Sequence, residues 1–151
     1  MKHLNRAQIR YIEHELYYYE QSKRELIQLR EEITDSGGAI RYDTINVSGG
    51  GPGNPTESKV IKLMSSPAIA HLSRTVTAVE TSLDILTDKH RDLFNLKYIL
   101  RFDAGRICRE MPTSERSYYR MRQELIEMVA HAMGIQSHGR NMAGTTGVDI
   151  V

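Results

Sequence analysis

The stretch "ICREMPTSERSYYRMRQELI", residues 107–126, decides how the second half of this 151-residue chain folds. Proline cannot continue a helix, because it lacks the backbone N–H and its ring clashes with the preceding turn. Two residues after Pro112, Ser114 offers a hydroxyl that can accept a hydrogen bond from the first free N–H groups of a new helix. The stretch therefore predicts a short helix, a break over "PTS" and a longer helix.

The two helices have clear expected ends and one shared apolar side. Asp103 can cap the shorter helix, which we expect to run to about Met111, and the longer one should run from Glu115 to about Met133 and end at Gly134. At 100° per residue, one side of the longer helix carries Tyr118, Met121, Leu125, Met128, Val129 and Ala132. The shorter helix adds Ile107, Cys108 and Met111 to the same expected core.

The opposite side of these helices is polar and rich in arginine. Residues 101–122 hold six arginines and three acidic residues, a net charge of +3, although the whole chain has a net charge of only +1. Arginine pairs bidentately with guanine, glutamine with adenine, and hydroxyls with phosphate. The candidate DNA-contacting residues are Ser114, Arg116, Ser117, Tyr119, Arg120 and Gln123, with Arg106 and Arg109 for flanking phosphates. Exposed helix faces also carry such residues for solubility alone, and that alternative stays open.

Two further helices are expected in the first half of the chain. Apolar residues recur every three or four positions in two series, which is the spacing of a helix packed lengthwise on another helix. Ser66 and Pro67 mark a helix start before the second series. The series are Ile9, Ile12, Leu16, Tyr19, Leu26 and Ile33, interrupted by Lys23 and Arg30, and then Ile69, Leu72, Val76, Val79, Leu83 and Leu86. They predict an antiparallel hairpin or a dimerising coiled coil.

These patterns together predict an all-α protein, with an N-terminal helical hairpin or coiled-coil arm followed by a three-helix helix-turn-helix module. The predicted segments are a first helix at 1–33, a flexible Gly/Pro linker at 34–56, a second long helix at 57–86, the module at 87–134 and a disordered tail at 135–151. The first helix of the module should begin at Thr87 or Asp88 and place Leu93, Leu96 and Leu100 on one face.

Several function classes are disfavoured by the sequence. The single cysteine, Cys108, excludes an internal disulfide framework, and the scattered histidines form no metal-ligand spacing and no triad. The glycine-rich segment lacks the residues of a phosphate-binding loop. We therefore expect no enzyme activity, no metal and no cofactor. No apolar run approaches the ~20 residues of a membrane span, so we expect a cytoplasmic protein.

The segment "LTDKHRDLFNLKYILRFDAGRICREMPTSERSYYRMRQELIEMVAHAMG" resembles the C-terminal helix-turn-helix of sigma factors. In particular it is similar to that module in small phage late-gene activators of the RinA and ArpU type. The matching motifs are "ICREM" in the first helix, "SERSYYRM" at the start of the recognition helix and "MG" at its end. The resemblance covers roughly residues 5–135, including a first helix that ends in "LREEI", a linker and a second long helix.

This resemblance implies a regulator in a bacterial host cell that binds double-stranded promoter DNA and activates phage or prophage late genes with host RNA polymerase. By position it adds Arg122 to the candidate DNA contacts. Sigma-like turns usually have glycine and then an apolar residue where this chain has Pro112 and Thr113. Residues 1–86 show nothing like the sigma region that melts the −10 element.

Two other classes of function fit the same pattern. A small-terminase-like DNA-packaging subunit also joins a helix-turn-helix to oligomerising helices, and an assembly of eight or more subunits would favour it. A helical scaffold protein without nucleic acid fits if the arginine face is only solvated. For the activator we expect a homodimer or a higher homo-oligomer.

Overall fold

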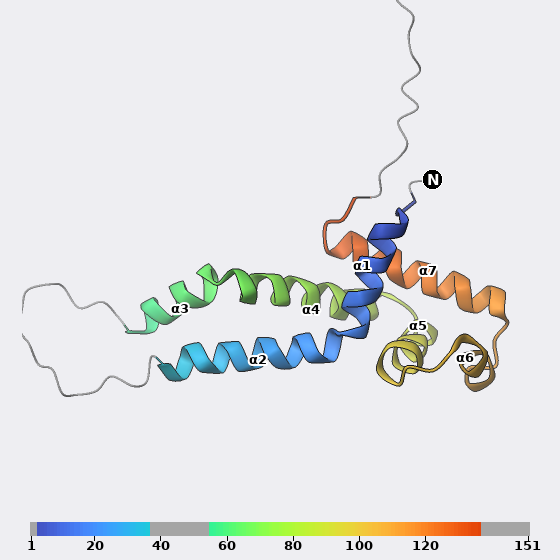
Figure 1. Ribbon diagram of the computed structural model, residues 1–151, viewed down its shortest axis with the longest axis horizontal. Helices are drawn as coiled ribbons and strands as arrows, with labels where there is room; N and C mark the ends of the chain where they lie inside the picture. The colour runs from blue at the N-terminus through green and yellow to red at the C-terminus, as the bar shows by residue number, and fades with distance from the viewer. Residues whose placement is uncertain (1–2, 37–54, 137–151) are drawn as a thin grey trace, which may run out of the picture.

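The computed structural model describes residues 3–36 and 55–136. Within these ranges every regular secondary-structure element is a helix, which confirms the predicted all-α class (Figure 1). The predicted linker and tail lie largely outside the described residues. The elements are α1 (Arg6–Tyr17), α2 (Tyr19–Ser36), α3 (Pro55–Ser65), α4 (Pro67–Ile85), α5 (Asp88–Phe94), the π-helix η1 (Asn95–Ile99), α6 (Ala104–Glu110) and α7 (Glu115–Ala132).

The main core lies where α1 and the C-terminal helices meet. Helix α7 packs against α1, α4, α5 and α6, and α1 lies across it (Figure 1). Each of these helices contributes fully buried side chains to this core, among them Ile12, Leu16, Val79, Leu93, Ile107, Leu125, Ile126 and Val129. The burial of these apolar surfaces is the main favourable contribution to the fold of this body.

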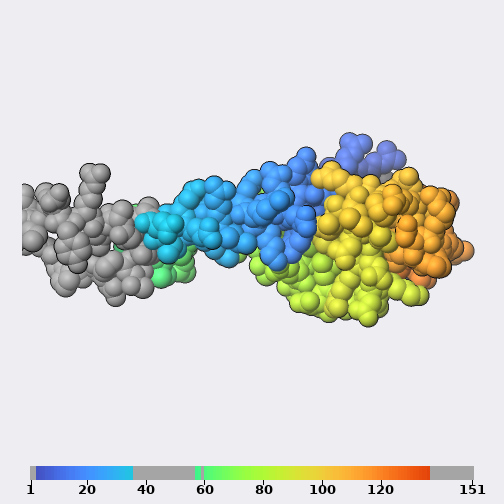
Figure 2. Space-filling view, turned by 90° about the horizontal axis from the view of Figure 1, so that it is seen from below, coloured from blue at the N-terminus to red at the C-terminus, as the bar shows by residue number. Residues whose placement is uncertain are grey.

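Helices α2 and α4 run antiparallel beside each other and form a second, smaller core. The Tyr19 hydroxyl donates to Glu80 Oε1 at 2.9 Å, and Arg30 Nη2 donates to Ser73 Oγ at 3.4 Å. A later residue of α2 thus contacts an earlier residue of α4, as antiparallel helices require. Leu26, Ile69 and Val76 are the buried residues of this core. We call α2, α3 and α4 the arm, because they extend as a narrow projection from the wider body (Figure 2).

The predicted first helix is divided at Tyr18. This residue ends α1 with φ of −98° and ψ of 7°, outside helical geometry, and α2 begins at the next residue. The division gives the two halves different partners: Ile12 and Leu16 enter the main core, whereas Leu26 enters the core of the arm. A single straight helix could not lie across α7 and also follow α4.

The second predicted helix is also divided, at Ser66 and Pro67, where the sequence predicts a helix start. The Ser66 hydroxyl accepts a hydrogen bond from the Ile69 N–H at 3.4 Å, and Pro67 occupies the first turn of α4, as predicted. Helix α3 precedes this cap as a separate element. The second apolar series then serves both cores, with Ile69 and Val76 in the arm and Val79 in the body.

The prediction that three leucines share one face after Asp88 is wrong. Leu93 is fully buried and Leu96 partly so, but Leu100 is exposed. The reason is η1, where Leu100 N–H bonds Asn95 O in the wider π spacing. A π turn inserts an extra residue and rotates everything after it, so the 3.6-residue period no longer holds.

Candidate nucleic-acid interface

The break between α6 and α7 has the caps that the sequence predicts. Asp103 Oδ1 accepts a hydrogen bond from Arg106 N–H at 2.8 Å and begins α6. Ser114 Oγ accepts from Ser117 N–H at 3.2 Å and begins α7, which ends before Gly134 at a φ of 74°. The caps satisfy N–H groups that would otherwise lack partners. They fix where the first turn of α7 starts.

The buried side of α7 is close to the predicted one but is wider and rotated. Four of the predicted residues are buried, namely Tyr118, Met121, Leu125 and Val129. Ala132 is exposed, contrary to prediction, while Ile126 and Ala130 are buried instead. The cause is that α1, α4 and α5 all pack on α7, so more than one stripe of the helix is covered.

The first two turns of α7 leave their other side uncovered. Arg116, Tyr119 and Arg120 are exposed there, and Ser114 lies at the tip of the helix. The Tyr119 ring contacts the buried Tyr118 ring edge-on, with centroids 5.0 Å apart, so an exposed aromatic is held by a core residue. We call Ser114, Arg116, Tyr119 and Arg120 the arginine face.

Helix α6 adds two exposed arginines. The Arg106 guanidinium lies over the Phe102 ring at 3.5 Å from its centroid and is 3.8 Å from Glu110 Oε1. Arg109 is exposed and makes no ion pair with any described residue. Arg106 is thus held in place by its neighbours, whereas Arg109 is free to meet an anion.

Two predicted polar contacts are less available than the arginines. Ser117 is half-buried, and its hydroxyl accepts from the Ser114 hydroxyl at 3.1 Å. Gln123 is also half-buried, and its amide donates to Glu127 Oε1 at 2.8 Å. Each would have to give up a hydrogen bond within the protein to bind DNA.

Arg122, which the resemblance places among the DNA contacts, lies on the inner side of α7. Its Nε and Nη2 atoms are 2.8 and 2.7 Å from Glu13 Oε1 of α1, and the Tyr98 hydroxyl donates to the same oxygen at 3.2 Å. Burial alone would lower the pKa of Arg122, but the Glu13 carboxylate raises it. Arg122 therefore fastens α1 to α7 and does not belong to the arginine face.

Lys97 forms a cluster that sequence reasoning missed. Its ammonium lies 5.7, 5.4 and 6.0 Å from the ring centroids of Tyr17, Tyr98 and Tyr118. Burial would lower the pKa of Lys97, but hydrogen bonds with the Tyr118 and Tyr17 hydroxyls raise it, so the lysine stays charged. The cluster holds α1, η1 and α7 together, and its Tyr118 ring contacts Tyr119 of the arginine face.

The turn before α7 is strained at Pro112. Its φ is 20°, whereas the pyrrolidine ring prefers about −65°. The Thr113 N–H donates to Cys108 O at 3.1 Å, which closes the end of α6 in the way that a glycine in the left-handed conformation usually does. Here a proline occupies the position at which a helix end of this geometry usually has glycine.

A known protein family matches most of this chain. The family described as "Protein of unknown function (DUF722)" matches residues 5–131. The chain belongs to this family. No curated protein and no solved structure matches this DUF722 chain. The matched span includes both cores and the whole arginine face.

The strain at Pro112 of this DUF722 chain leads to a stability prediction. Replacing Pro112 with glycine is expected to raise the free energy of unfolding by about 1 kcal/mol, since the relief of strain exceeds the entropy that glycine adds to the unfolded chain. Urea denaturation followed by circular dichroism measures it. Pro67→Gly is the matched control: Pro67 suits its helix start, so the same substitution should destabilise there. Destabilisation by both would contradict the strain.

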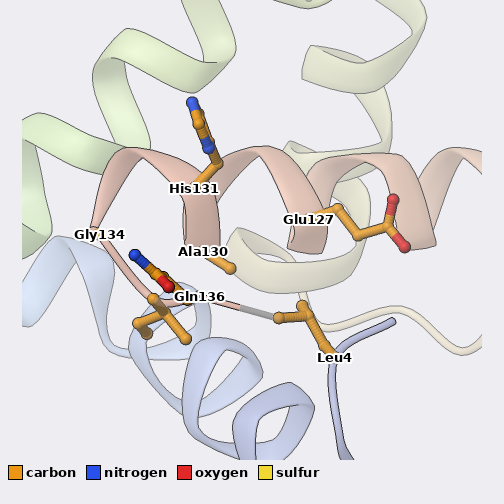
Figure 3. Close-up of a pocket in the computed structure, with 7 residues that line it drawn as sticks. Leu4, Glu127, Ala130, His131, Gly134 and Gln136 are labelled. Carbon is orange, nitrogen blue, oxygen red and sulfur yellow. The ribbon is translucent and has the colours of Figure 1, made fainter. Parts of the chain in front are cut away.

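A hollow of about 440 Å³ lies at the far end of α7 from the arginine face. Leu4 from the start of the chain and Gln136 border it together with Glu127, Ala130 and His131 of α7 (Figure 3). It offers a carboxylate and an imidazole but no arginine or lysine. The lining of this hollow in the DUF722 chain is therefore not suited to an anion such as a phosphate.

Other kinds of site are not found in the part of the chain that the structure describes. No three His, Cys, Asp or Glu side chains there are grouped so that they could hold a metal ion. Among the same residues, none of the helices combines the length and the apolar character that crossing a membrane requires.

Proposed function

We propose that this DUF722 protein is a DNA-binding transcription activator of phage or prophage late genes, which acts in the cytoplasm of the bacterial host. In this proposal α6 and α7 form a helix-turn-helix, and α7 enters the major groove with its N-terminal turns. Host RNA polymerase is the proposed partner, because the resemblance to RinA- and ArpU-type activators implies it.

The observation that carries the proposal is the arginine face itself. Arg116 and Arg120 lie one turn apart on an exposed helix surface whose other side is fixed in the core. In the proposed complex, that spacing would allow both guanidinium groups to reach neighbouring base pairs of a major groove. Neither is held by a close ion pair: Arg120 Nε is 3.9 Å from Glu124, and Arg116 has no ion pair with a described residue.

The remaining contacts would position the helix. Arg109 and Arg106 at the preceding helix are suited to phosphates on one side of the groove, and the Tyr119 hydroxyl is suited to a phosphate or a base edge. The Lys97 cluster and the Glu13–Arg122 pair would hold α7 at a constant angle to the DNA.

Fluorescence anisotropy tests the proposal. The purified protein is titrated into duplex fragments from upstream of the late operon of its own genome, and into scrambled duplexes, at ~50 and ~200 mM salt. We expect at least ~1000-fold preference for one fragment and weaker binding at the higher salt, since contacts to phosphates release counterions. No binding at either salt, also with RNA polymerase present, would reject the proposal and favour a scaffold.

A further inference from the structure

The outer half of the arm exposes four large apolar side chains. Ile27 of α2 and Val60, Ile61 and Met64 of α3 have between 47% and 79% of their surface exposed. By comparison, three apolar side chains of the described residues are buried in the core of the arm. Leu26, Ile69 and Val76 already pack α2 against α4. A partner of the arm therefore has to contact a different surface.

The four side chains lie on one side of the arm. Leu26 of α2 and Leu63 of α3 take part in the core between the helices. Ile27 and Met64 each follow these residues by one position, a rotation of 100°. Because the two helices run in opposite directions, the same rotation leads to the same side of the pair. Val60 and Ile61 are turned toward that side too, and we call the four residues the Ile27 face.

Charges beside Ile27 are arranged so that the face is complementary to itself. Arg24 and Glu31 lie three residues before and four residues after Ile27, which places them on its side of the helix. Both are exposed, and neither makes an ion pair with a described residue. If α2 of one copy lies antiparallel on α2 of another, Arg24 of each copy meets Glu31 of the other, and the two Ile27 side chains meet between these pairs.

We propose that the partner of the Ile27 face is a second copy of this chain, docked α2 against α2 about a two-fold axis. A two-fold interface requires a surface that complements itself, and the order arginine, isoleucine, glutamate has that property. Val60, Ile61 and Met64 of each copy extend the apolar contact along α3. If the proposed DNA recognition also holds, the dimer presents two arginine faces to inverted half-sites.

Sedimentation equilibrium of the full chain over about 1–100 µM tests the dimer without DNA, so its outcome is separate from that of the DNA-binding proposal. We expect twice the mass of one chain. Arg24→Glu is expected to raise the dimer Kd at least ~10-fold, because symmetry turns two attractive contacts into two repulsive ones. Glu31→Arg should do the same, and the two substitutions together should restore the dimer.

Two more variants complete the test. Ile27→Asp should give a monomer with unchanged helical circular dichroism, whereas Leu100→Asp, at an exposed leucine of the body, should leave the dimer intact. A monomer at every concentration would overturn the proposal. So would a dimer that persists in Arg24→Glu and Ile27→Asp, a double charge swap that does not restore association, or an assembly of eight or more subunits.

Discussion

Replacing Arg116 and Arg120 together with alanine is expected to remove the sequence preference for a promoter fragment that the proposed function requires. An arginine that is bidentate to a guanine contributes roughly 1–3 kcal/mol of discrimination, so the two losses together approach the ~1000-fold preference expected of a specific site. Binding to scrambled duplex should fall much less, because Arg106 and Arg109 remain for phosphate contacts. Anisotropy titrations on the preferred and the scrambled duplex measure both changes.

The matched control removes the same charge elsewhere. Arg6 and Arg10 are exposed on α1. The start of α1 lies beside the end of α7, where Gln8 Nε2 donates to Gln136 O at 2.9 Å. Arg6→Ala with Arg10→Ala should therefore preserve the preference and change only the salt-dependent, non-specific part of binding. Equal loss on all duplexes in the Arg116 and Arg120 variant would mean that these arginines contact only phosphates.

Local signals in the sequence were sufficient for the caps and for much of the helical pattern. Asp103, Ser114 and Ser66 each begin a helix with a side-chain hydrogen bond to a backbone N–H, as predicted. Such caps depend on residues three positions apart, so a sequence window contains all that is needed. The exposed position of Arg116 and Arg120 follows from the same periodicity.

Features that depend on distant partners were not predictable in this way. No proline or glycine marks the division at Tyr18, which exists because α1 has to lie across α7. The π turn at η1 has no signature in the 100° pattern, so Leu100 was assigned to the wrong side. The position of Arg122 in a motif predicts a DNA contact, but it gives no sign of the pair with Glu13, which is 109 residues away.

The largest stability loss that we predict from the polar groups of the body is for Arg122→Ala, which should lower the free energy of unfolding by about 2 kcal/mol. The substitution leaves the Glu13 carboxylate between α1 and α7 with only the Tyr98 hydroxyl as a partner. Breaking a fully buried pair costs roughly 3–5 kcal/mol, and the smaller value is expected because the Arg122 and Glu13 side chains keep 24% and 20% exposure. Urea denaturation measures the loss.

Arg120→Ala is the control for this prediction, since it removes an arginine from the same helix. Its side chain is 69% exposed and 3.9 Å from Glu124, so the expected change in stability is below about 0.5 kcal/mol. Combining Arg122→Ala with Glu13→Ala should destabilise less than the sum of the single changes, because no charge is left unpaired. The folded Arg122→Ala protein should also keep its DNA preference. If it instead lost that preference at unchanged stability, Arg122 would be a DNA contact after all, and the pair with Glu13 would have to open when DNA binds.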